Sequence, residues 1–408
     1  MQTENTNSKN VWLLVIVASL GYFVDIYDLL LFAIVRVKSL TDIGVLAERT
    51  RETGEFVMNI QMAGLLIGGI LWGIIGDKFG RIKVLFGSIL LYSIANVING
   101  FVQDVPSYAI IRFIAGIGLA GELGAGITLV SETMSKDKRG YGTMVVAVVG
   151  VLGAVAANLV AKHYNWRTAY FVGGGLGFLL LLLRMGTFES GMFTHVKESS
   201  VVRGGFKLIF NSKERFLKYL YCILVGIPLW YVIGILIAQS PEIGKAIGAK
   251  ETLTAGAGIM YSYIGISVGD LLASLFAQLT KSRRLTIFVF LLLSLGTVIF
   301  YLNYKGLTEN SFIWISFVMG LGVGYWATFV TIASEQFGTN IRATVTTTAP
   351  NFVRGSLIPI TFVFEFFNKH FGIINACYIV MILVTVISLF ALSQLKETFN
   401  KDLDYLEE

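Results

Sequence analysis

Charged residues are scarce in this chain of 408 residues, of which only 14% are charged and 55% are hydrophobic. An ordinary soluble domain carries about 25% charged residues, so this chain cannot cover itself with a water-compatible surface. The mean hydropathy of +0.72 agrees with that conclusion. The shortage of charge excludes a large soluble catalytic domain and a nucleic-acid-binding module. The net charge of +6 then reflects the basic loops that stay in the cytoplasm rather than a nucleic-acid partner.

Cysteine and histidine are also rare. The two cysteines, Cys222 and Cys377, both lie in apolar segments, where the role of a small hydrophobic residue is expected. The three histidines, His163, His195 and His370, fall in separate loops, and no two of them have the spacing of metal ligands. Neither a nucleophile elbow nor a phosphate-binding glycine loop occurs. We therefore predict no disulfide, no metal and no cofactor, and an integral-membrane enzyme is disfavoured.

Long apolar runs dominate what the chain does contain. A helix needs about 20 apolar residues to cross the hydrocarbon core of a bilayer. Twelve such runs predict an all-α integral membrane protein with twelve transmembrane helices, at positions 11–35, 56–77, 84–103, 107–130, 142–162, 168–186, 216–239, 254–279, 285–303, 311–333, 343–367 and 371–394. The polar first residues lead into the first run without a cleavage site, so we expect this span to be retained.

Basic residues predict the orientation, because lysine and arginine collect in cytoplasmic loops. With the N-terminus inside, the loops on that side hold most of the basic residues, and both termini are predicted to be cytoplasmic. The first outer loop is the exception, since it carries Arg36, Lys38, Arg49 and Arg51. One long polar stretch lies in mid-chain. It predicts a six-helix bundle at 1–190, a cytoplasmic linker at 191–215, and a second six-helix bundle with a short tail at 216–408.

The two halves of the sequence resemble each other. Glu132 is followed by Arg139, and the same pair returns at the same spacing in the second half as Glu335 and Arg342. The inner loop at 77–83 has a weaker copy at 278–284, at nearly the same offset. Six spans separate the copies, so both halves enter the membrane from the same side. The sequence therefore predicts a parallel repeat, related by a pseudo-twofold axis along the membrane normal.

The loop between the second and third spans carries a specific motif. Gly73, Asp77, Lys78, Gly80 and Arg81 stand at the spacing Gly-x-x-x-Asp-Lys-x-Gly-Arg. This pattern resembles the signature loop of the major facilitator superfamily of secondary transporters. An acid at a helix end among basic residues can pair with a neighbouring helix in one conformation and lose that pairing in another. We therefore expect a gating role for this loop.

Further motifs narrow the resemblance to the metabolite–proton symporters and sugar porters. The paired acids and arginines of the two halves, and the Arg-x₃-Gly-x-Gly-x₂-Gly-Glu pattern at 112–122, are similar to motifs of that branch. The paired glutamines of sugar-binding seventh spans and the glycine–proline pattern of drug/proton antiporters are both absent. For Glu122 a gating or helix-packing role and a substrate role are equally open. The expected gating residues are Asp77, Lys78, Gly80, Arg81, Glu122, Glu132, Arg139, Glu335 and Arg342.

Charges inside the spans need a reason, because each costs about 2.5–3.5 kcal/mol at the bilayer centre. Asp28 in the first span and Arg112 in the fourth lie at comparable depth. A neighbouring arginine favours the ionised carboxylate whereas desolvation opposes it, so small movements can switch the protonation of such an acid. We predict that Asp28 carries the coupling proton and that Arg112 modulates it, as the Tyr27–Asp28 pair of the resembled porters also implies. Asp25 is the alternative carrier, and a static buried ion pair is the alternative role.

Polar and aromatic residues near the middle of other spans predict a substrate site between the halves. Arg354 is the best candidate for binding a carboxylate or phosphate, because its planar guanidinium group offers a fork of donors. A salt bridge with Asp270 in the same half is the alternative role for Arg354. The predicted substrate-binding residues are Arg354, Asn351, Asp270, Asn158, Gln61, Trp230, Tyr231 and Trp326.

Together these features predict a secondary active transporter that acts as a functional monomer in a lipid bilayer. It is expected to move a small polar metabolite (an organic anion, an amino acid or a zwitterion) by alternating access, with that molecule and protons as its partners. The resemblance implies proton-coupled import across a bacterial inner membrane. The alternatives are proton-driven export of a siderophore or drug-like compound and, in another class, a membrane enzyme. A channel is disfavoured because the charges are dispersed rather than arranged in rings.

Overall fold

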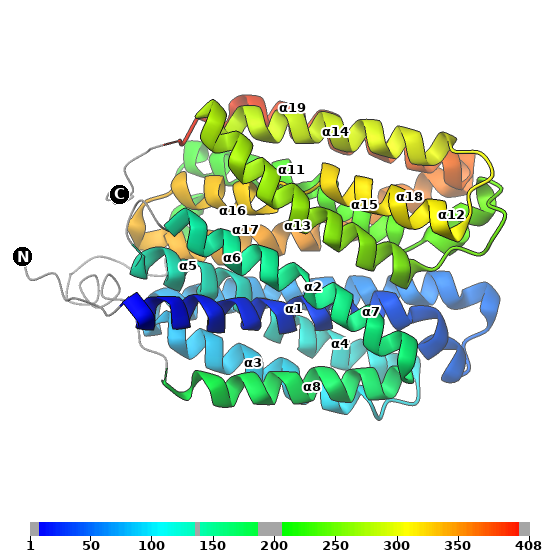
Figure 1. Ribbon diagram of the computed structural model, residues 1–408, viewed down its shortest axis with the longest axis horizontal. Coiled ribbons are helices and arrows are strands. Elements are labelled where there is room, and N and C mark those ends of the chain that lie inside the picture. Colours follow the sequence, from blue (N-terminus) through cyan, green and yellow to red (C-terminus); the bar gives the residue numbers. More distant parts are fainter. Residues whose placement is uncertain (1–7, 135–138, 187–205, 400–408) are drawn as a thin grey trace, which may run out of the picture.

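The computed structural model describes residues 8–134, 139–186 and 206–399, and every regular element in these ranges is a helix. Figure 1 shows two bundles side by side, the first half of the chain coloured from blue to green and the second from green to red. Helix α1 (Ser8–Asp42) begins at the same end of the molecule at which α19 (Ile373–Gln394) ends. We call this the near end and the opposite one the far end.

Six crossings form the first bundle. The first, second, third and sixth are continuous helices, whereas the fourth and fifth are each built from two helices. The continuous ones are α1, α2 (Thr50–Phe79), α3 (Arg81–Asn99) and α8 (Trp166–Leu183). The interrupted ones are α4 (Val105–Leu119) with α5 (Glu122–Thr133), and α6 (Arg139–Val151) with α7 (Gly153–His163). Two short 3-10 helices, η1 (Ala47–Arg49) and η2 (Arg184–Gly186), precede α2 and follow α8.

The second bundle repeats this plan. A short helix, α10 (Phe206–Phe210), lies in the part of the expected linker that the structure describes, and the predicted boundary at 190 falls outside the described residues. The seventh crossing joins α11 (Lys213–Tyr231), the π-helical η3 (Val232–Ile237) and α12 (Ser240–Ala246). The others are α13 (Ala255–Thr280), α14 (Arg283–Asn303), α15 (Glu309–Gly322) with α16 (Trp326–Glu335), α17 (Thr339–Gly355) with α18 (Leu357–Phe371), and α19.

Eleven of the twelve crossings are helices long and apolar enough to span a membrane. The other is the eleventh crossing, predicted as one span at 343–367 but formed by α17 and α18, which meet at Ser356. Helix α17 is rich in polar residues, and many of their side chains, such as those of Thr344, Thr347 and Arg354, are buried. These groups face protein rather than lipid, and polar residues within membrane spans are expected to do so. The eleventh crossing can therefore span the membrane although its sequence is not apolar throughout.

Most of the interrupted crossings occupy corresponding positions in the two bundles. Four of them match, the fourth and fifth in the first half and the tenth and eleventh in the second, whereas the seventh, with its π-helical turn, has a continuous counterpart in α1. At the tenth crossing, a Cβ atom on Gly324 would come within 2.5 Å of the Cα of Gly269 in α13, so only glycine permits this approach. Broken helices at matched positions indicate a binding site near the middle of the membrane.

Ion pairs join the two bundles at the far end. Arg36 of α1 lies 2.8 Å from Glu242 of α12, and Arg51 of α2 pairs with Glu365 of α18. Arg36 and Arg51 belong to the first outer loop region that departs from the expected distribution of basic residues. Their pairing accounts for two of the four basic residues of this region, because each of these arginines is neutralised by an acid of the opposite bundle.

Close packing joins the bundles on the near side of the centre. A Cβ atom on Gly69 of α2 would lie 3.0 Å from the side chain of Asn351, and one on Gly124 of α5 would lie 2.4 Å from the Cα of Thr347. The Asn351 amide also donates a hydrogen bond to the carbonyl of Ala120 at 2.7 Å. The bundles therefore touch on both sides of the centre, so the structure represents a closed state.

Candidate functional site

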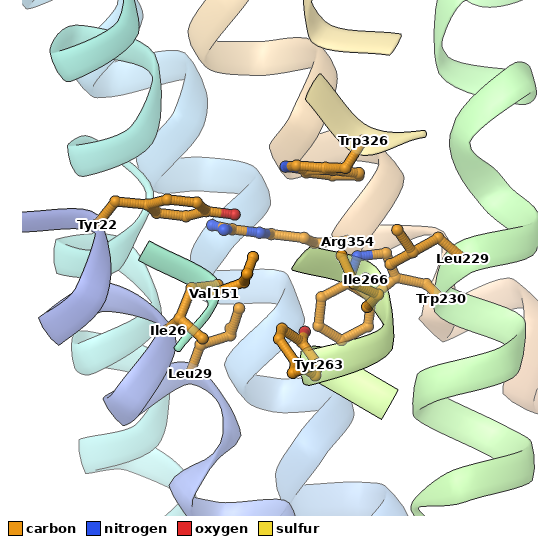
Figure 2. Close-up of a pocket in the computed structure, with 10 residues that line it drawn as sticks. All are labelled: Tyr22, Ile26, Leu29, Val151, Leu229, Trp230, Tyr263, Ile266, Trp326 and Arg354. Carbon is orange, nitrogen blue, oxygen red and sulfur yellow. The ribbon is translucent and has the colours of Figure 1, made fainter. Parts of the chain in front are cut away.

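A small pocket lies between the two bundles near mid-depth, and Figure 2 shows its lining. Four aromatic rings, one cation and several aliphatic side chains surround a space that can hold about one water molecule. Both halves contribute to it. The first half supplies Tyr22, Ile26, Leu29 and Val151, and the second supplies Leu229, Trp230, Tyr263, Ile266, Trp326 and Arg354.

Arg354 is the one charged residue among the ten that line the pocket, and it is buried. It is the last residue but one of α17, next to the break before α18. In Figure 2 its guanidinium group extends across the pocket toward the hydroxyl of Tyr22, with Trp326 on one side and Tyr263 on the other. A buried cation requires an anionic or strongly polar partner, so the pocket has the chemistry of an anion site.

The carboxylate that faces Arg354 comes from the opposite bundle. Asp25 of α1 accepts a hydrogen bond from Nη2 of Arg354 at 3.2 Å, and Asn351 Oδ1 accepts one from Nη1 at 3.4 Å. The alternative expectation of a salt bridge with Asp270 is wrong. Asp270 of α13 instead accepts a hydrogen bond from the backbone N–H of Ala327 at 2.8 Å, in the first turn of α16, where the helix dipole favours a negative charge.

Asp28 and Arg112 lie close together, as their depth predicts. Nη1 of Arg112 is 2.8 Å from Oδ1 of Asp28, and both side chains are fully buried within the first bundle. Arg112 also donates to the backbone carbonyl of Asp28, to Gln61 and to Asn96, and it lies 5.5 Å from the ring centroid of Tyr170. Gln61, expected in the substrate site, therefore belongs to the network around this arginine and does not line the pocket.

A third buried ion pair joins Glu122, at the start of α5, to Arg184, in η2 after α8. Arg184 falls at the end of the predicted sixth span, where a solvent-facing position would be expected of a basic residue, but its side chain is only 1% exposed. Arg184 also donates to the carbonyls of Val17 in α1 and Leu85 in α3. The pair therefore ties four helices together, which favours the helix-packing alternative for Glu122.

Gly21 allows a test of this third ion pair. A Cβ atom at this position would lie 1.9 Å from atoms of both Arg184 and Glu122, so Gly21→Ala must displace the salt bridge. Both side chains can shift at their flexible ends, so we expect a loss smaller than the roughly 3–5 kcal/mol that removal of one partner of a buried pair costs. The melting temperature of the purified protein should still fall measurably. Gly175→Ala in α8 is the control, because nothing lies within 4 Å of its Cβ position. Equal melting temperatures for the two variants would contradict this structural role.

The other predicted substrate residues divide into two groups. Trp230 and Trp326 line the pocket, and Asn351 borders it through its hydrogen bond with Arg354. Tyr231 points elsewhere, because its hydroxyl donates to a backbone carbonyl of α19 at 2.6 Å. Asn158 of α7 contacts α13 of the opposite bundle outside the pocket lining.

Two tyrosines of the pocket, Tyr22 and Tyr263, are absent from the residues predicted from sequence. Tyr22 precedes Asp25 by three positions, and Tyr263 precedes Asp270 by seven positions. Residues at these intervals share a helix face. Following the face of each buried acid along its helix would therefore have identified both tyrosines.

The predicted gating loop of the first half contacts its own bundle. Arg81 donates to the carbonyl of Gly76 at 3.0 Å, Lys78 is exposed, and Gly80 takes a positive φ of 100° at the turn between α2 and α3. The backbone is helical at three further predicted gating residues, whose side chains lie outside the described part of the structure. They are Asp77, Glu132 and Arg139.

The matching loop of the second half forms an ion pair and contacts with backbone carbonyls. Glu335 of α16 lies 2.8 Å from Arg283 of α14. Arg342 of α17 donates to the carbonyls of Ser334 and Phe337. These contacts connect the near ends of three helices within one bundle, and their gating role stays a prediction.

Comparisons with known proteins identify relatives along most of the chain. It is similar to a putative metabolite transport protein of Haemophilus influenzae, with 28% identity over 364 residues that cover 84% of this chain and 85% of the relative. It is also similar to the 3-(3-hydroxy-phenyl)propionate transporter of Escherichia coli, with 27% identity over 312 residues that cover 72% of each.

A solved structure has the same fold. The MFS proton:xylose symporter XylE, bound to 6-bromo-6-deoxy-D-glucose, aligns with a TM-score of 0.74 and 18% identity, covering 97% of this chain and 98% of that one. The family model of the Major Facilitator Superfamily matches residues 11–360. Because this match spans most of the sequence and the relatives are transporters, the chain belongs to the Major Facilitator Superfamily and is a secondary transporter of twelve membrane-spanning helices rather than an enzyme.

Proposed function

We propose that this transporter imports a small carboxylate together with protons across the inner membrane of a bacterium. The observation that carries the proposal is Arg354, the one charged residue among the ten that line the pocket between the two bundles, which aromatic and aliphatic side chains otherwise surround. A guanidinium group can bind a carboxylate through two parallel hydrogen bonds. The substrate named for the relative from Escherichia coli combines a carboxylate with an aromatic ring, and these two features suit the pocket.

Alternating access explains why the pocket is too small for such a molecule in the closed state. The ion pairs of Arg36 and Arg51 with the second bundle must separate when the far end opens. The contacts of Gly69 and Gly124 with α17 must separate when the near end opens. The two sets of contacts lie on opposite sides of Arg354, so breaking one set at a time exposes the anion site to one side at a time.

Proton coupling is proposed for the pair of Asp28 and Arg112. Both residues are fully buried, and a carboxylate with one arginine partner can change its protonation when the pair is separated or hydrated. The pair lies within the first bundle, close along α1 to Asp25 at the substrate pocket. A shift of α1 on substrate binding would therefore act on both acids.

The near end is proposed to face the cytoplasm. The basic loops collect there, and the predicted topology places both termini on that side. Both halves of the pocket come from one chain, so the proposed working unit is a monomer.

Transport by the purified protein in proteoliposomes tests the proposed function. With the outside more acidic, we expect uphill uptake of 3-phenylpropionate or benzoate that exceeds the uptake of protein-free liposomes and that a protonophore abolishes. Uptake of the neutral benzamide should not exceed that of protein-free liposomes. Protein-free liposomes supply the baseline, because the small neutral fraction of a weak acid crosses bilayers rapidly and accumulates by itself on the alkaline side. Accumulation of neutral sugars in place of carboxylates, or uptake that ignores the pH gradient, would contradict the proposal.

A further inference from the structure

We propose that Asp25 occupies the anion site of Arg354 while the transporter is empty, and that a substrate carboxylate displaces it as Asp25 takes up a proton. The inference rests on the proposed function, because it takes Arg354 as the anion site. It adds a role for Asp25 as an internal competitor of the substrate. The structural basis is that Asp25 of α1 and Arg354 of α17 meet across the two bundles, at the wall of the pocket.

The contact between Asp25 and Arg354 has the geometry of an exchangeable pair. It consists of one hydrogen bond of 3.2 Å, whereas strong charge-assisted bonds measure about 2.7–2.9 Å and arginine often binds carboxylates through two bonds at once. The second carboxylate oxygen of Asp25 is buried and has no hydrogen-bond partner among the described residues. A substrate carboxylate that bound Arg354 through both oxygens would therefore form a better pair than Asp25 does.

Arg112 provides the contrast within the same molecule. Its bond to Asp28 measures 2.8 Å, and three further acceptors of its own bundle surround its guanidinium group. Arg354 makes two hydrogen bonds within the described part of the structure, to Asp25 and Asn351. Since Arg354 also lines the pocket and Arg112 does not, a carboxylate is expected to exchange at Arg354.

The groups around Asp25 explain why it takes up a proton when the substrate binds Arg354. The neighbouring acids are already engaged, and the nearby phenols offer no positive charge. These groups are Asp28 with Arg112, Glu122 with Arg184, Asp270 with the Ala327 amide, and Tyr22, Tyr92 and Tyr263. Once the substrate binds Arg354, Asp25 has no other arginine to join among the described residues. A buried carboxylate without a cation is costly, so Asp25 takes up a proton.

The exchange balances in charge and in atoms. Arg354 releases one carboxylate and gains another, and one oxygen of Asp25 gains a proton from solvent. The net charge of the pocket is unchanged, so a negatively charged substrate enters a buried site without an uncompensated charge. One proton accompanies each anion through Asp25, apart from any proton on Asp28. The displacement also removes a contact that holds the two bundles together at their centre.

Calorimetry of benzoate or 3-phenylpropionate binding to the purified full chain tests this inference. Titrations between pH 6 and 8, in two buffers with different ionisation enthalpies, count the protons taken up while the ligand stays ionised. We expect about one proton per carboxylate bound, and an affinity that falls up to tenfold for each unit rise in pH. Asp25→Asn should abolish both the proton uptake and the pH dependence. Asp42→Asn, at the exposed far end of the same helix, should retain both.

The outcomes separate this inference from the proposed function. If the carboxylate binds the wild-type protein without proton uptake, or if Asp25→Asn keeps the wild-type pH dependence, Asp25 is not a competitor, while Arg354 stands as the anion site. If neither carboxylate binds, or if both bind Arg354→Gln as tightly as wild type, the proposed function fails and the inference fails with it. Should Asp25→Asn not fold, the proton count of the wild-type protein still decides.

Discussion

Arg354→Ala is expected to weaken the binding of small carboxylates by roughly 30- to 5,000-fold. This range corresponds to the 2–5 kcal/mol lost when one partner of a buried, hydrogen-bonded charge pair is truncated. The reason is that Arg354 is the one cation among the ten residues lining the pocket, so no other lining side chain can replace it. A thermal-shift screen of carboxylates on the wild type and the variant, followed by calorimetry on each hit, measures the effect.

Two further variants distinguish the loss of the anion site from a loss of folding. Arg354→Lys keeps the charge but loses the planar fork of donors, so we expect an affinity between those of the wild type and Arg354→Ala. Arg354→Ala leaves Asp25 buried without its partner, which is destabilising. The double variant Asp25→Asn with Arg354→Gln removes both charges at once and should also fail to bind carboxylates.

An arginine outside the pocket supplies the matched control. Arg49 lies in η1 with an exposed side chain, so Arg49→Ala should bind carboxylates as the wild type does. Undiminished stabilisation of Arg354→Ala by a carboxylate that also stabilises the wild type would reject Arg354 as the anion site.

Most of the fold could be predicted because the membrane imposes it. Runs of about 20 apolar residues must form helices in hydrocarbon, where every backbone polar group needs an internal partner. The eleventh crossing shows the limit of this rule. The polar side chains of α17 are buried against protein, and hydropathy does not reveal which helices avoid lipid. The break at Ser356, by contrast, lies between Gly355 and Pro359, two residues that weaken a helix.

The sequence predicted which types of residue form the candidate site, but it predicted less well which side chains pair with each other. The depth of Asp28 and Arg112 along their spans predicted that they lie close together, and they do. The partner of Arg354 is Asp25 rather than Asp270, although 329 positions separate the pair. Helical periodicity assigns a residue to a face of its own helix, but it does not tell which helix of the other bundle that face meets.

Arg184 illustrates a second reason why the partners of buried charges could not be predicted from the sequence. It directly follows an apolar run and precedes the basic linker, so its sequence context indicates a loop residue. Its buried position depends on Glu122, which lies on another helix and provides the carboxylate that neutralises it. An arginine at a helix end is therefore ambiguous until its acid is known.

Asp28→Asn is expected to lower the steady-state accumulation of substrate about tenfold for each unit of the pH gradient. One proton per cycle contributes about 1.36 kcal/mol per pH unit, and about 1.4 kcal/mol changes an equilibrium tenfold. Asparagine keeps the size of the side chain and an oxygen that can accept the bond from Arg112. Substrate exchange without a gradient should therefore continue. Uptake and counterflow in the same proteoliposomes measure the two activities.

The ratio of accumulation to exchange separates proton coupling from a static role of this pair. If Asp28 and Arg112 only hold α1 against α4, the variant will lose both activities together or keep both. Asp42→Asn is the control on the same helix, because Asp42 lies at the far end of α1 with a side chain that is 55% exposed, and it should retain wild-type accumulation. Full uphill accumulation by Asp28→Asn would reject Asp28 as the proton carrier, since a residue that cannot ionise cannot return a proton in each cycle.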